Sequence, residues 1–211
     1  MIETAVVAFT TLFATIGPID VAAMFAALTG RHAAHLRRSM AIRGVLVATG
    51  ILLAFALSGG TLLAHLGISL AALRTAGGIL LLLIGIDMVF ARSSGGVSTT
   101  QDEAEEATTK SDIAVFPLAT PLLAGPGAMG AIILLMANAE GSLQHQAIVI
   151  AMLLAVMLLA FVMMMGAGQL QRVLGVTGMH VVSRIFGVLL SALAVQFLFD
   201  GIAASGLLSG N

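Results

Sequence analysis

Apolar residues gather in six long runs, which short polar segments separate. The runs lie at about 5–28, 42–64, 71–90, 113–137, 146–168 and 182–204. An α-helix rises 1.5 Å per residue, so roughly 20 residues cross the ~30 Å hydrocarbon core of a bilayer. The pattern therefore predicts an all-α membrane protein with six transmembrane helices.

The longest polar stretch, residues 92–112, divides these runs into three and three. It holds five acidic residues with Arg92 and Lys110, among Ser, Thr and Gly. Such a composition is typical of a flexible solvated linker. We expect a first three-helix repeat over 1–91, a polar cytoplasmic linker over 92–112, and a second three-helix repeat over 113–211.

The composition narrows the function classes. Of the 211 residues, 59% are hydrophobic and 9% are charged, against roughly 25% charged in soluble domains. The net charge of −1 offers no basic surface for nucleic acid. Without cysteine the chain has no disulfide and no thiolate metal site. We expect no cofactor and no nucleic-acid partner.

The distribution of Lys and Arg predicts the orientation in the membrane. Eight of the nine lie in the first, third and fifth loop regions, and the opposite side holds only Arg74. Because positive residues accumulate on the cytoplasmic side, both termini are expected to be periplasmic or extracellular.

The two halves share features at nearly constant offsets. Gly17-Pro18 in the first run has a counterpart 108 residues later at Gly125-Pro126, and Arg74 has one 110 residues later at Arg184. A half with three spans makes the next half enter the membrane from the opposite side. This predicts two inverted three-helix repeats, an architecture that recurs in secondary transporters.

Proline and glycine predict that helices 1 and 4 are broken. Gly17-Pro18 interrupts the first run, and Pro117, Pro121 and Gly125-Pro126-Gly127 interrupt the fourth. Proline has no N–H and clashes with the preceding turn. A break presents free N–H groups that attract a carboxylate, and free carbonyls that attract an ammonium group. A single proline often only kinks a membrane helix, but matching breaks in both halves favour a midplane binding site.

A small zwitterionic solute held between the breaks would have these candidate contacts: Gly17, Pro18, Ile19, Asp20, Thr120, Pro121, Gly125, Pro126, Gly127 and Gln196. Asp20 is either a proton carrier or substrate contact, or a cap on the helix after the break, because a carboxylate at this depth is costly without such a role. Gln196 lines the pathway or bridges helices.

Charged residues near the span ends suggest coupling and gating residues: Asp20, Arg74, Asp87, Arg184 and Asp200. Inverted symmetry would allow an outer ion-pair gate of Arg74 with Asp200, and an inner gate of Arg184 with Asp87. The alternative is that each arginine anchors its helix at the headgroups, while Asp87 pairs with Arg92.

Enzyme signatures are incomplete. Gly85-Ile-Asp87 lacks the second glycine of the GxGD signature of membrane aspartyl proteases, and Ala56-Leu-Ser58-Gly59 falls one residue short of GxSG. The GxGxxG match at 125–130 follows no strand and lies in a membrane-length run, so it is not a dinucleotide site. No predicted helix carries two histidines at metal-ligand spacing. We therefore expect no enzyme and no metal site.

The stretch Phe116-Pro-Leu-Ala-Thr-Pro-Leu-Leu-Ala-Gly-Pro-Gly127 is similar to the PLAxPxxAGPG segment of the MarC family, or SnatA-type neutral amino acid transporters. Leu73-Arg-Thr-Ala-Gly-Gly-Ile79 and Ser183-Arg-Ile-Phe-Gly187 resemble its third and sixth spans, so the resemblance covers about 5–204. Many members have Asp or Asn before the first proline, whereas this chain has Gly17 there and Asp20 downstream.

The resemblance implies a six-span protein of the bacterial or archaeal inner membrane that transports small neutral amino acids such as glycine and alanine, coupled to H⁺ or Na⁺. We expect a secondary transporter that works by alternating access. The alternatives are a non-transporting scaffold or assembly protein, and an exporter of another small solute or of a metal ion. The small-residue faces of the helices leave a homo-oligomer open.

Overall fold

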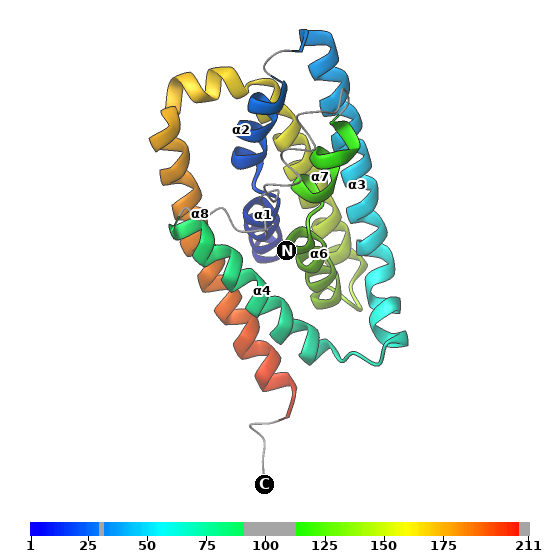
Figure 1. The fold of residues 1–211 in the computed structure, drawn as a ribbon. Coiled ribbons are helices and arrows are strands. Elements are labelled where there is room, and N and C mark those ends of the chain that lie inside the picture. The colour runs from blue at the N-terminus through cyan, green and yellow to red at the C-terminus, as the bar shows by residue number, and fades with distance from the viewer. Residues whose placement is uncertain (30–31, 91–112, 207–211) are drawn as a thin grey trace.

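A computed structural model describes residues 1–29, 32–90 and 113–206, and this part of the chain is helical without any strand. In chain order the elements are α1 (Ile2–Ile16), α2 (Pro18–Thr29), α3 (Ala34–His65), α4 (Leu70–Phe90), η1 (Ala114–Leu123), α6 (Pro126–Asn138), α7 (Leu143–Met165) and α8 (Ala167–Ala204) (Figure 1). The all-α prediction is confirmed. The predicted linker at 92–112 lies outside the described residues.

Five helical segments in the described chain are long and apolar enough to cross a membrane: Ile2–Ala26, Ala34–Thr61, Leu70–Phe90, Leu143–Met165 and Arg184–Ala204. A sixth span results if η1 and α6, which meet at an angle of 55°, count as one. The exact six-span arrangement and the inverted repeat remain predictions.

The last helix is longer than its apolar run. The predicted span at 182–204 agrees with the span Arg184–Ala204, but the helix that contains it, α8, already begins at Ala167. No proline between 168 and 182 stops the helix. Its first part crosses one end of the bundle before the rest runs beside α4 (Figure 1).

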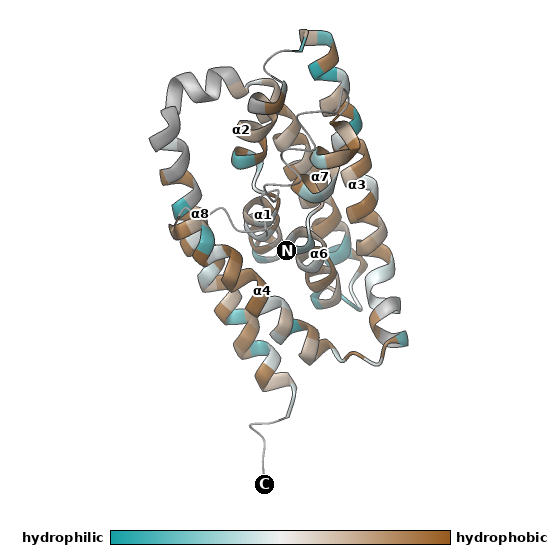
Figure 2. Cartoon of the chain, viewed as in Figure 1, coloured by the Kyte–Doolittle hydropathy of each residue, from teal (hydrophilic) through white to brown (hydrophobic). Residues whose placement is uncertain are grey.

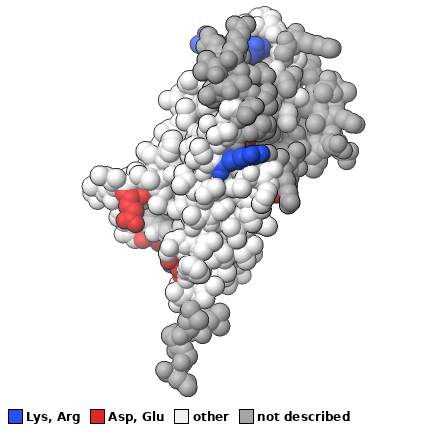
Figure 3. All heavy atoms as spheres, turned by 90° about the vertical axis from the view of Figure 1, so that its left-hand side faces the viewer, with Lys and Arg blue, Asp and Glu red and all other residues white. Residues whose placement is uncertain are grey.

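The outer surface is apolar. Large side chains point outward along the spans, including Leu57, which is 70% exposed, and Leu158, which is 63% exposed. Apolar residues dominate the helices in Figure 2, and charged residues interrupt the face in Figure 3 at only a few places. An apolar surface of this extent suits lipid rather than water.

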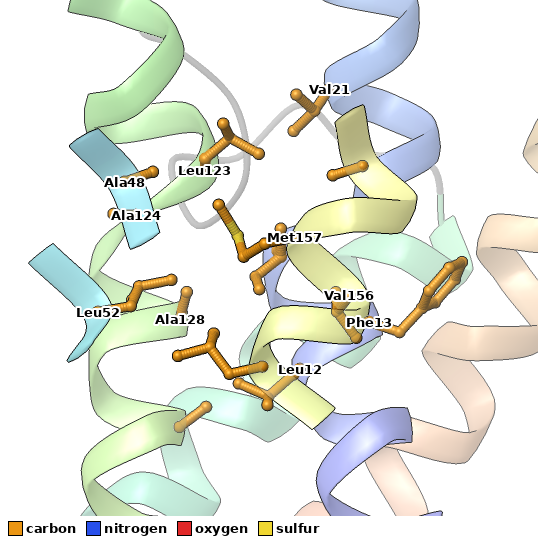
Figure 4. Packing of buried hydrophobic residues seen from close by; sticks show 14 of the residues in the cluster. Leu12, Phe13, Val21, Ala48, Leu52, Leu123, Ala124, Ala128, Val156 and Met157 are labelled. Atoms are coloured by element: carbon orange, nitrogen blue, oxygen red, sulfur yellow. The ribbon is translucent and has the colours of Figure 1, made fainter. Parts of the chain in front are cut away.

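Most core residues come from α1, α2, α3, η1, α6 and α7, and α4 and α8 add Leu81 and Leu190 among others. Figure 4 shows side chains from these elements packed together, among them Leu12, Leu52, Leu123 and Met157. Leu12 and Leu52 are fully buried, and every residue in the second half of α1, from Thr11 to Ile16, is at most 7% exposed. The two predicted breaks, between α1 and α2 and between η1 and α6, therefore lie inside the bundle rather than at its lipid-facing surface.

Helices α4 and α8 form a closely packed antiparallel pair. A Cβ built on Gly78 would lie 2.8 Å from the Ala194 carbonyl oxygen, and one on Gly187 would lie 2.9 Å from the Gly85 carbonyl oxygen. Such distances leave no room for a methyl group, so glycine lets the two backbones touch. We call α4 and α8 the paired helices.

Candidate functional site

The first predicted break lies at Gly17. Helix α1 ends at Ile16, and Gly17 adopts left-handed backbone angles, with φ 60° and ψ 55°. Its N–H donates to the Phe13 carbonyl oxygen at 3.0 Å. Glycine fits here because a side chain would clash in this conformation. Helix α2 then starts at Pro18 and has Asp20 in its first turn.

The second break is wider. Within η1 the backbone becomes extended at Phe116 and at Thr120, and each of them precedes a proline. A proline ring disfavours helical angles in the residue before it. Some hydrogen bonds of η1 span five residues, such as that from Ala124 N to Ala119 O at 2.9 Å. Gly125 is extended, and α6 begins at Pro126.

The two interrupted elements lie side by side, since α2 contacts η1 and α1 contacts α6. Apolar residues of both elements are buried there: Ile19 and Val21 in α2, and Leu123 in η1. Met157 of α7, also buried, lies below Val21 and Leu123 in the view of Figure 4. In this conformation, buried apolar side chains therefore pack beside the breaks.

The predicted contact residues differ in their exposure. Gly17, Pro18, Ile19, Gly125 and Gly127 are buried, Asp20, Thr120 and Pro121 are half-buried, and Pro126 and Gln196 are exposed. The Thr120 hydroxyl donates to the Val115 carbonyl oxygen at 3.3 Å. Gln196 lies near the end of α8, in a cavity that none of the break residues lines.

A cavity of about 380 Å³ lies at the end of the bundle that holds the N-terminus. We call it the charged cavity. Elements from both halves line it with the polar side chains of Glu3, Arg74, Asn138, His145, Gln196 and Asp200. Three residues singled out from the sequence, Arg74, Gln196 and Asp200, thus share one site, away from the breaks.

Two charged side chains of this cavity form hydrogen bonds with neutral side-chain amides. Arg74 donates from Nε to the Asn138 side-chain oxygen, which links α4 to α6. Asp200 accepts a hydrogen bond of 2.8 Å from Gln196 Nε2, one helical turn earlier. Arg74 and Asp200 form no ion pair with any described residue.

The inner gate is likewise not formed. Asp87 is half-buried in α4 and Arg184 is exposed in α8. Neither makes an ion pair within the described chain. The gating roles of Asp87 and Arg184 stay predictions, as do those of Arg74 and Asp200.

The structure adds Thr11, which we did not single out. It is fully buried, and its hydroxyl has no hydrogen-bond partner among the described residues. Thr15 donates to the Thr11 carbonyl oxygen at 2.8 Å. The sequence feature that could have identified Thr11 is the spacing of Thr4, Thr11 and Thr15, which places all three on one face of a helix.

Metal ligands do not converge in the described parts of the chain. No group of three or more His, Cys, Asp or Glu side chains there is placed to hold an ion. We therefore name no metal ligands.

Comparison with known proteins places the chain in one family. A sequence profile for the MarC family integral membrane proteins matches residues 2–205. A UPF0056 membrane protein of Methanocaldococcus jannaschii is 37% identical over 93% of this chain and 95% of its own length. UPF0056 membrane proteins of Bacillus subtilis and Escherichia coli are each 33% identical over 92% of this chain, and over 92% and 89% of their own lengths. No solved structure matches significantly.

Proposed function

The chain belongs to the MarC family of integral membrane proteins, and from this premise we propose that it is a secondary transporter of small neutral amino acids such as glycine and alanine. It works by alternating access and couples transport to H⁺ or Na⁺. It is a multi-pass membrane protein with relatives in bacteria and archaea.

The observation that carries this proposal is the pair of interrupted helices in the core. Gly17 ends α1 in a left-handed conformation, and the bend of 55° separates η1 from α6. Non-helical backbone at membrane depth is tolerated where it is buried in protein or lines a cavity. Transporters use such half-helix ends to hold carboxylate and ammonium groups near the midplane.

The paired helices support the alternating-access part of the proposal. They contact each other more extensively than either contacts the core elements. The charged cavity lies between the two groups, because Arg74 and Asp200 come from the paired helices, and Glu3 and Asn138 come from the core. Movement of one group against the other would open and close the cavity.

We infer that the solute would pass from the charged cavity to the first break along α1. Val7 lines the cavity, Thr11 lies one turn deeper, and Gly17 lies about 9 Å beyond Thr11 at 1.5 Å per residue. Across this route, the rings of Phe13 and Phe186 lie 4.2 Å apart. In this conformation the ring contact closes α1 against α8 below the cavity.

Asp20 is the proposed coupling residue. It is half-buried in the first turn of α2, where a helix N-terminus stabilises a negative charge. Protonation removes that charge, so the state of Asp20 would bias which conformation the broken helix adopts.

Transport by purified protein in liposomes tests this function. Labelled glycine or alanine should accumulate when a pH or sodium gradient is imposed, and empty liposomes should not accumulate it. Asp20→Asn should retain exchange of labelled for unlabelled solute but lose accumulation. Failure of the native protein to move either amino acid under both gradients would refute the function, and unchanged accumulation by Asp20→Asn would refute the role of Asp20.

A further inference from the structure

The charged cavity has the features of a binding site independently of the breaks. Its volume of about 380 Å³ falls within the range of roughly 300–1,000 Å³ typical of small-molecule sites. Five elements line it: the starts of α1, α4 and α7, and the ends of α6 and α8. Their convergence gives the cavity walls that come from distant parts of the sequence.

The cavity holds charges of both signs that do not neutralise each other. Arg74 lines it together with Asp200 and Glu3, yet none of the three forms an ion pair among the described residues. A guanidinium is always charged and has five N–H donors. One of these, at Nε, binds the neutral Asn138 side chain. Within the described residues, the charge of Arg74 is therefore not matched by a carboxylate.

The acidic side is arranged in the same way. Gln196 donates to one oxygen of Asp200, and an amide leaves the negative charge uncompensated. Opposite charges that face one cavity without touching suit a ligand that carries both signs and fits between them. The apolar residues Val7, Leu135 and Phe197 complete the lining and provide a surface for a short apolar group.

We propose that the charged cavity binds a small zwitterion such as an α-amino acid, with its carboxylate on Arg74 and its ammonium group on Asp200 and Glu3. Arginine can bind a carboxylate with two parallel hydrogen bonds. The site is distinct from the breaks and lies between the start of α1 and the end of α8. The role of this site in receiving or releasing the transported solute rests on the proposed function, whereas the binding of a zwitterion to the site does not.

Binding of L-alanine to purified protein in detergent, measured by isothermal titration calorimetry, tests the site. Alaninamide lacks the carboxylate and propionate lacks the ammonium group, and each should bind at least tenfold more weakly than alanine. Arg74→Gln should weaken alanine binding at least tenfold and remove the preference for alanine over alaninamide. Arg74→Lys should restore part of this preference. Asp200→Asn should remove the advantage over propionate.

Arg38→Gln is the matched control, because Arg38 is an exposed arginine of α3 that does not line the cavity. It should bind alanine as the native protein does. Absence of alanine binding by the native protein, or unchanged affinity and selectivity in folded Arg74→Gln, would overturn the proposal.

The outcomes separate this site from the proposed function. Alanine binding with the predicted selectivity but no uptake into liposomes would support the site and refute the transporter. Alanine uptake with an unchanged KM in Arg74→Gln would overturn the site and leave the transporter standing.

Discussion

Replacement of Gly17 by alanine tests the first break directly. Gly17 has φ 60° and ψ 55°, a conformation that costs an L-residue with a Cβ roughly 1–2 kcal/mol relative to glycine. Pro18 still prevents a continuous helix, so the methyl group cannot be relieved by restoring regular hydrogen bonds. We expect Gly17→Ala to lower the free energy of unfolding by about 1–2 kcal/mol.

Two variants sharpen this measurement by denaturant unfolding in detergent. Gly17→Asn should lower the free energy of unfolding less than Gly17→Ala does, because asparagine tolerates the left-handed conformation. Gly130→Ala is the matched control: a Cβ there meets no atom within 4 Å in the helix α6. Removal of a helix-interior glycine should gain up to ~1 kcal/mol. If Gly17→Ala were as stabilising as Gly130→Ala, the reasoning that Gly17 interrupts the helix would be refuted.

Two further predictions concern packing and the buried hydroxyl. Gly78→Ala should lower stability by about 1–3 kcal/mol, because its Cβ would lie 2.8 Å from Ala194 O and 3.0 Å from Leu198 N. Gly60→Ala is the control and should not lower stability, since its Cβ would meet nothing within 4 Å. Equal thermal unfolding temperatures of the two variants would contradict the close pairing of α4 and α8. Thr11→Val should raise stability by about 1–3 kcal/mol, since it removes a buried hydroxyl without a partner, yet lower uptake into liposomes. Thr15→Val should give no such gain, because the Thr15 hydroxyl is bonded to the Thr11 carbonyl oxygen, and a less stable Thr11→Val would contradict the assignment.

The sequence predicted the breaks because their causes are local. Proline removes an N–H at Pro18 and Pro126, and Gly17 allows the left-handed backbone angles that end α1. The membrane-length apolar runs likewise set most helix positions. The start of α8 at Ala167 was missed because its first turns carry polar residues, which hydropathy does not assign to a span.

The charged cavity could be predicted only in part. Arg74, Gln196 and Asp200 stood out as polar residues at span ends, but their convergence with Glu3 and Asn138 depends on how distant helices pack. Periodicity within one helix carries no information about that packing. For the same reason, the apolar side chains that fill the space beside the breaks were not foreseen: Val21 and Leu123 are ordinary members of apolar runs.

The most direct test of the central claim, that solute passes the interrupted helices, is the accessibility of a cysteine placed at the second break. The chain contains no cysteine, so Ala124→Cys, at a position now 1% exposed, can be labelled without background. The account predicts reaction with a water-soluble thiol reagent from each side of the membrane, at rates that added alanine changes. Leu158→Cys, on the lipid-facing surface of α7, should remain unlabelled, and equal protection of Ala124→Cys from both sides under all conditions would contradict the account.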